Sequence, residues 1–249
     1  MTGLSILMFG LLLGMKHATE ADHLAAVATL ATRESSLTGT IRQGVAWGIG
    51  HTLTLMLFGG IVLALGKAIP QQMERMLELA VGMMLIALGI DVLRRLRRQR
   101  VHLHLHAHGP GVKHLHAHSH AGEHVGNNRQ PYGLHRNAMH RHAHRPQLPV
   151  RAVAVGMMHG LAGSAALIVL SLGAVQSIPM GIFFIALFGL GSITGMALLS
   201  MAVAIPLRMT AGYFTWMQNG VTAAIGGFTC VLGTWVVYRI GFVEGLLAG

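Results

Sequence analysis

The chain has 249 residues, of which 53% are hydrophobic and only 10% charged, with 18 Lys and Arg against 8 Asp and Glu. Because an ordinary soluble domain carries about 25% charged residues, this composition excludes one and indicates a membrane protein. The formal charge of +10 does not indicate nucleic-acid binding, since the basic residues cluster between apolar segments without aromatic residues among them.

Six apolar segments are long enough to cross a bilayer as helices, because a helix rises about 1.5 Å per residue and about 20 residues span the hydrocarbon. They cover residues 3–32, 43–66, 74–93, 151–174, 178–205 and 214–239. We therefore predict an all-α integral membrane protein, surrounded by lipid, with six transmembrane helices. Its predicted parts are a first membrane half at 1–93, a loop at 94–150 and a second membrane half at 151–249.

The first segment contains ionisable residues in the stretch GMKHATEADHL at 14–24, among them His17, Glu20, Asp22 and His23. Burying such groups in hydrocarbon is costly, so they usually face a protein interior and mark an ion pathway. On a regular helix, at about 100° per residue, Asp22 and His23 point about 140° and 240° away from His17. Either the helix is interrupted between residues 17 and 23, or the two histidines serve successive binding stations.

The loop at 94–150 carries 13 of the 17 histidines, a low-complexity composition typical of metal binding. Its low apolar content predicts disorder in the absence of metal. Neutral imidazole binds metal and titrates near about pH 6.5, so acidification should release bound ions. The alternative is a passive solvated loop. The predicted accessory ligands are His102, His104, His106, His108, His114, His116, His118 and His120.

Basic residues predict the orientation in the membrane. The loops after the first, third and fifth segments hold most of them, including Arg33, Arg42 and Arg208, whereas the other side has only Lys67, Arg75 and Arg239. By the positive-inside rule the histidine-rich loop is cytoplasmic and both termini lie outside. We expect a multi-pass protein of the bacterial inner membrane.

The two halves resemble each other weakly. GMKH at 14–17 aligns with GMMH at 156–159 at an offset of 142, and GIGHTLTLM at 48–56 aligns with GLGSITGMA at 189–197 at an offset of 141. Because each half has three spans, an odd number, successive halves run in opposite directions. This predicts a 3+3 inverted repeat, whose interface near the midplane typically holds the substrate site.

The four histidines outside the loop, His17, His23, His51 and His159, all fall inside predicted spans. The last three lie 8 to 10 residues from the nearest predicted cytoplasmic arginine, roughly 12 to 15 Å into the membrane. Nitrogen and carboxylate ligands suit Ni, Co or Zn, and the single cysteine, Cys230, argues against a thiolate site. The predicted intramembrane ligands are His17, Glu20, Asp22, His23, His51 and His159.

KHATEADHL, with its HxxxxDH spacing, resembles the first signature of the nickel/cobalt transporter family, and WGIGHTLTL resembles that family's Gly-His motif. HGLAGSAAL at 159–167 is similar to its shorter members, the urease-associated nickel permeases and related nickel/cobalt efflux proteins. The resemblance implies that His17, Asp22, His23 and His51 carry transported Ni(II) or Co(II), and the donor types add Zn(II) as a further cargo. It implies no cofactor, and a cytoplasmic metallochaperone or a urease or hydrogenase maturation protein as partner.

Three functions compete at this level. A secondary transporter is the first, since no P-loop motif for ATP hydrolysis occurs; uptake is favoured by the HxxxxDH pattern, and efflux is the alternative. The longer importers' acidic second-half motif is missing, with Gly163 and Ser164 in its place. An intramembrane metalloenzyme is the second, although the zinc-protease motif HExxH is absent. A metal sensor or store built around the histidine loop is the third.

Overall fold

The computed structural model describes residues 3–34, 36–65, 70–98, 102–107, 113–118, 149–162, 177–211 and 215–246. Contacts divide the chain into two compact units. One unit comprises Met1–Leu93 together with Leu148–Gly249, and the other comprises Arg94–Gln147.

The first unit is helical. Its elements are α1 (Gly3–His17), α2 (Ala21–Ala31), α3 (Leu37–Leu65), α4 (Gln71–Arg98, which continues into the second unit), α5 (Val150–Ala162), α7 (Ile178–Ala211), α8 (Thr215–Tyr238) and the π-helical turn η1 (Arg239–Val243).

Four helices in the described ranges are long and apolar enough to cross a membrane: Leu37–Leu65, Gln71–Arg98, Ile178–Met209 and Met217–Val243. They coincide with the second, third, fifth and sixth predicted segments, and the protein is a multi-pass membrane protein. Of the fourth segment, 151–174, the structure describes only the part within α5, so Gly163 and Ser164 lie outside the described residues.

The first predicted segment is interrupted, which settles one of the alternatives left open by the helical periodicity. α1 ends at His17 and α2 begins at Ala21. In between, both the backbone amide and the hydroxyl of Thr19 donate to the carbonyl of Lys16, at 2.9 and 2.6 Å. Glu20 then adopts an extended conformation and its carbonyl accepts the amide of Leu24 at 2.9 Å, which starts α2. The turn thus satisfies backbone groups that a broken helix leaves open.

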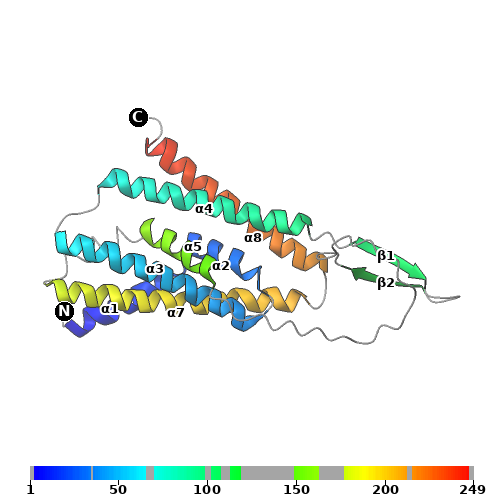
Figure 1. The fold of residues 1–249 in the computed structure, drawn as a ribbon, viewed down its shortest axis with the longest axis horizontal. Coiled ribbons are helices and arrows are strands. Elements are labelled where there is room, and N and C mark those ends of the chain that lie inside the picture. The colour runs from blue at the N-terminus through cyan, green and yellow to red at the C-terminus, as the bar shows by residue number, and fades with distance from the viewer. Residues whose placement is uncertain are drawn as a thin grey trace, which may run out of the picture. The chain divides into compact units, whose positions relative to one another are not determined.

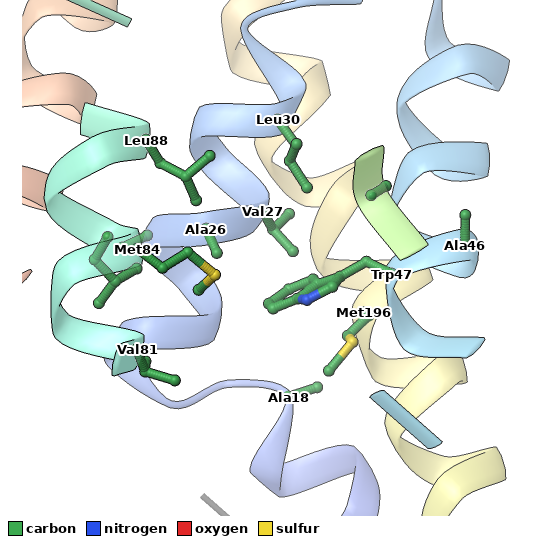
Figure 2. Packing of buried hydrophobic residues seen from close by; sticks show 13 residues of the cluster. Ala18, Ala26, Val27, Leu30, Ala46, Trp47, Val81, Met84, Leu88 and Met196 are labelled. Atoms are coloured by element: carbon green, nitrogen blue, oxygen red, sulfur yellow. The ribbon is translucent and has the colours of Figure 1, made fainter. Parts of the chain in front are cut away.

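The short helices α2 and α5 lie between α4 and α8 on one side and α1, α3 and α7 on the other (Figure 1). Helix α3 packs against both α5 and α7, α1 packs against α7, and α2 contacts α3, α7 and α8. Figure 2 shows Trp47 extending from α3 toward Ala26 and Val27 of α2, with Met84 of α4 nearby and Met196 below it. The short helices are therefore enclosed by the long ones.

Glycines allow the helices to approach closely, as is common in membranes. A Cβ atom on Gly156 of α5 would lie 2.0 Å from the carbonyl oxygen of Trp47, and one on Gly14 of α1 would lie 2.0 Å from that of Phe188. Two further pairs come almost as close, Gly50 with the carbonyl oxygen of Val153 at 2.2 Å and Gly191 with that of Leu11 at 2.1 Å, whereas Gly89 with Gly226 and Gly233 with Gly82, both at 2.7 Å, are looser. At these crossings any side chain would force the two helices apart.

The second unit corrects the expectation of a wholly disordered loop. Strands β1 (His102–Ala107) and β2 (Lys113–His118) form an antiparallel pair, with His102 opposite His118 and Ala107 opposite Lys113. The His-Leu alternation has the period of two that suits a strand, and pairing satisfies backbone groups without a large core. Two predicted accessory ligands, His108 and His120, lie outside the described residues.

Candidate metal centre

Four histidines from four helices meet in the first unit. His17 ends α1, His23 lies in the first turns of α2, His51 is in the middle of α3, and His159 is near the end of α5. All four are at most 2% exposed. The ring centroids of His23 lie 4.4 Å from His17, 5.3 Å from His51 and 4.2 Å from His159. The structure therefore brings together every histidine that the sequence places inside a span.

Ligand atoms fall into two groups of three that share His23. His17, His23 and His51 form one, which we term the inner trio; Asp22, His23 and His159 form the other, the outer trio. Within each group the ligand atoms lie within 4.8 Å of one another. Two nitrogens that bind one ion at about 2.1 Å can be at most about 4.2 Å apart. The ligand atoms of each trio therefore need to move only slightly closer together to bind an ion. An ion can thus pass from one trio to the other while His23 remains a ligand.

Asp22 holds two of these rings. One carboxylate oxygen lies 3.0 Å from Nδ1 of His23 and also accepts the backbone amide of His23 at 2.8 Å. The other lies 2.9 Å from Nε2 of His159. Because a carboxylate only accepts hydrogen bonds, each contacting ring nitrogen carries the proton. The opposite nitrogens, Nε2 of His23 and Nδ1 of His159, then carry no proton. For Asp22 itself to bind an ion as a member of the outer trio, the ion must displace the ring protons that the carboxylate accepts, as metal binding to histidine sites commonly does.

Several ring nitrogens have no hydrogen-bond partner among the described residues although they are fully buried. They are both nitrogens of His17, Nε2 of His23, both nitrogens of His51 and Nδ1 of His159; within the described residues, Nδ1 of His17 has only the ion-pair contact with Glu20. An unsatisfied buried polar group costs about 1 to 3 kcal/mol, so a cluster of them is unfavourable unless a ligand occupies it. The donor set, imidazole with a nearby carboxylate, fits a divalent transition-metal ion.

Glu20 occupies the interruption between α1 and α2. Its carboxylate oxygen lies 3.0 Å from Nδ1 of His17, and its side chain is 52% exposed. The regular helical wheel places this residue between the two histidines, but in the structure the extended backbone at Glu20 brings its carboxylate to His17. Glu20 therefore links the inner trio to the surface.

Two aromatic residues that were not predicted as part of the site enclose the centre. The fully buried ring of Trp47 lies 5.3 Å from the ring of His23 and 5.5 Å from that of His159, and Phe188 lies 5.4 Å from His17. Ser192 is also fully buried, and its hydroxyl has no partner among the described residues. It could have been found from the repeat alignment, where it takes the position of His51.

Replacing Asp22 with Asn is expected to weaken Ni(II) binding by about 10- to 100-fold, the usual cost of losing a carboxylate that orients metal-bound histidines. The amide keeps the shape of the side chain but can no longer accept N–H groups from both His23 and His159. Titration of the purified chain with Ni(II) measures the change. The matched control is Asp91→Asn, which alters the carboxylate paired with Arg33. Equal affinities of the two variants would contradict the orienting role.

No family model matches the chain, and no solved structure matches it. Among curated proteins, the urease accessory protein UreH of Bacillus sp. (strain TB-90) is 32% identical to it over 244 residues. The alignment covers 98% of this chain and 95% of that relative. It therefore includes both membrane halves and the loop between them.

Proposed function

The chain belongs to the family of the urease accessory protein UreH, and we propose from this premise that it is a secondary transporter of Ni(II) or Co(II). The membership confirms the resemblance to the urease-associated permeases drawn from the motifs. The protein is not an enzyme, in keeping with a relative that is named as an accessory protein.

The observation that carries the proposal is the position of His23. It belongs to both trios, beside the interruption between two half-helices in an otherwise apolar membrane unit. Interrupted helices at the midplane are a common device for ion sites in secondary transporters. A site built for permanent retention needs one set of ligands, whereas two sets with a shared member allow an ion to move. We assign the intramembrane ligand roles to His17, Glu20, Asp22, His23, His51 and His159, with Zn(II) as a further cargo.

We further propose six spans arranged as a 3+3 inverted repeat. Support comes from close contacts that recur at the offsets of the aligned motifs: Gly156 against Trp47 is the counterpart of Gly14 against Phe188, with offsets of 142 and 141. Such pairs of reciprocal contacts are expected when two similar halves are related by a twofold axis. In this arrangement the centre lies at the interface of the halves, and the broken first span and α5 occupy equivalent places.

The orientation that we propose follows the basic residues. Arg33, Arg42 and Arg208 mark the cytoplasmic side of the bacterial inner membrane, and both termini face outward. The histidine-rich loop is then a cytoplasmic metal buffer, in which His102 to His108 and His114 to His120 exchange ions with the centre. A cytoplasmic metallochaperone or a urease or hydrogenase maturation protein would be the next recipient.

Deleting residues 101–145 is expected to leave the maximal transport rate within about twofold and to change only the metal concentration at which transport responds, because both trios lie outside the deleted segment. Initial rates of Ni(II) transport in proteoliposomes measure this. A control deletes the same residues in the His23→Ala background, which should remain inactive. Loss of transport in the deletion alone would favour the sensor or storage function.

Transport and its direction can be tested by measuring total cellular nickel and cobalt with elemental mass spectrometry. Cells carry the intact chain, the His23→Ala variant at a matched protein level, or an empty vector. We expect higher metal with the intact chain, which means uptake, the direction favoured by HxxxxDH. Lower metal would mean efflux. If all three strains hold equal metal, the transport function is wrong.

A further inference from the structure

We propose that Glu78 is a docking carboxylate for the metal cation at the mouth of a cavity leading to the outer trio, and that Arg239 occupies this carboxylate when the ion is absent. The inference rests on the proposed transport function and adds to it the face by which ions reach the centre. It also names the residue that competes with them.

A cavity of about 360 Å³ lies against the centre. Its lining includes Glu20, Asp22 and His159 from the region of the centre, together with Glu78 of α4, Trp235 of α8 and Arg239 of η1. At about 30 Å³ per water molecule, this is room for a divalent ion with its first hydration shell. Among the residues of the two trios, those of the outer trio other than His23 line the cavity, whereas His17 and His51 do not.

His159 links this cavity to metal binding. Its side chain is fully buried, it lines the cavity, and its Nδ1 has no hydrogen-bond partner in the described ranges. Asp22, which also lines the cavity, holds the other nitrogen of the same ring at 2.9 Å. An ion arriving through the cavity therefore meets Asp22 and His159, two of the three residues of the outer trio. The inner trio comes next, through the shared His23.

The charged residues that line the cavity allow a cation to replace Arg239 at the carboxylate of Glu78. Three carboxylates line the cavity, of Glu20, Asp22 and Glu78, against the single guanidinium of Arg239. Arg239 donates from Nη2 to Glu78 at 2.8 Å, joining η1 to α4. Because the two side chains are 44% and 31% exposed, the pair is weakly held and open to competition. A divalent cation carries twice the charge of the guanidinium and can displace it from Glu78.

Arg239 has a second carboxylate partner to which it can turn. Its Nε lies 3.3 Å from Glu244, which also pairs with Arg75 at 3.6 Å. When a cation takes Glu78, the guanidinium can remain on Glu244 without losing all charge compensation. Arg75 belongs to the same set of ion pairs but does not line the cavity, which makes it the matched control.

Docking and a merely structural ion pair predict different kinetics. If Glu78 docks the ion and Arg239 competes, Glu78→Gln raises the apparent KM for Ni(II), whereas Arg239→Gln lowers it. Each change should be about two- to fivefold, the range of a partly exposed charge interaction, with kcat nearly constant. If the pair only fastens η1 to α4, both substitutions remove the same contact and shift the kinetics in the same direction. The double variant should follow Glu78→Gln, because Arg239 acts only through that carboxylate.

The experiment measures initial Ni(II) transport against concentration in proteoliposomes that contain a metal-sensitive dye, for the intact chain and the variants. Opposite shifts in KM for Glu78→Gln and Arg239→Gln, with Arg75→Gln unchanged, support the proposal. Shifts in the same direction, no shift in either, or equal shifts in Arg75→Gln overturn it. His23→Ala keeps the two hypotheses separate: if it and the intact chain both match empty liposomes, transport itself is wrong and the docking role falls with it.

Discussion

Replacing His23 with Ala is expected to lower Ni(II) transport by at least about 100-fold, more than any other single histidine substitution in the centre. His23 belongs to both trios, so its loss leaves the inner trio with His17 and His51 and the outer trio with Asp22 and His159. Each remaining pair is one ligand short. The shared ring that lets an ion pass between the trios is lost as well.

Removing His51 or His159 should have a smaller effect on binding, because each belongs to one trio only. His51→Ala leaves the outer trio intact, and His159→Ala leaves the inner one intact. Both variants should therefore still bind Ni(II) in equilibrium titrations while transporting it slowly. The matched control is His124→Ala in the histidine-rich loop, which should transport at the rate of the intact chain. Equal losses of transport and binding in His23→Ala, His51→Ala and His159→Ala would contradict two stations that share a ligand.

Replacing Gly156 with Ala is expected to destabilise the protein by about 1 to 3 kcal/mol and to abolish metal binding by the outer trio. The new methyl group would lie 2.0 Å from the carbonyl oxygen of Trp47, in rigid backbone that cannot move aside. Helix α5 must therefore shift away from α3, and this shift moves His159 away from Asp22. A lower melting temperature in detergent, together with weaker Ni(II) binding, would be the result.

The control for this prediction is Gly60→Ala in α3, where an added methyl group meets no atom within 4 Å. It should be neutral or slightly stabilising, since alanine favours a helix over glycine. Gly14→Ala tests the repeat in the same experiment, because its methyl group would lie 2.0 Å from the carbonyl oxygen of Phe188. A loss of stability at Gly14 similar to that at Gly156 is expected. If Gly156→Ala behaves like Gly60→Ala, the close approach of α3 and α5 is wrong.

The sequence left the break in the first span as one of two alternatives, and the reason for considering it is local chemistry. Ionisable side chains at residues 17, 20, 22 and 23 cannot all face away from lipid on one regular helix. The hairpin at β1 and β2 was not predicted, although its alternation is visible in the sequence, because a period of two without a hydrophobic core is a weak signal. The ligand roles of the loop histidines stay predictions.

The sequence by itself determined the class of the protein and the residue types of its centre, since apolar length sets membrane helices and buried ionisable groups need partners. Only the tertiary structure decided which residues are those partners. Asp22 meets His159, 137 positions away, and Trp47 closes over the centre. The pairing of Glu78 with Arg239, 161 positions apart, likewise depends on how α4 lies against the end of α8. Membrane helices associate through small residues and complementary shape. No periodic pattern in the sequence therefore identifies which helix packs against which.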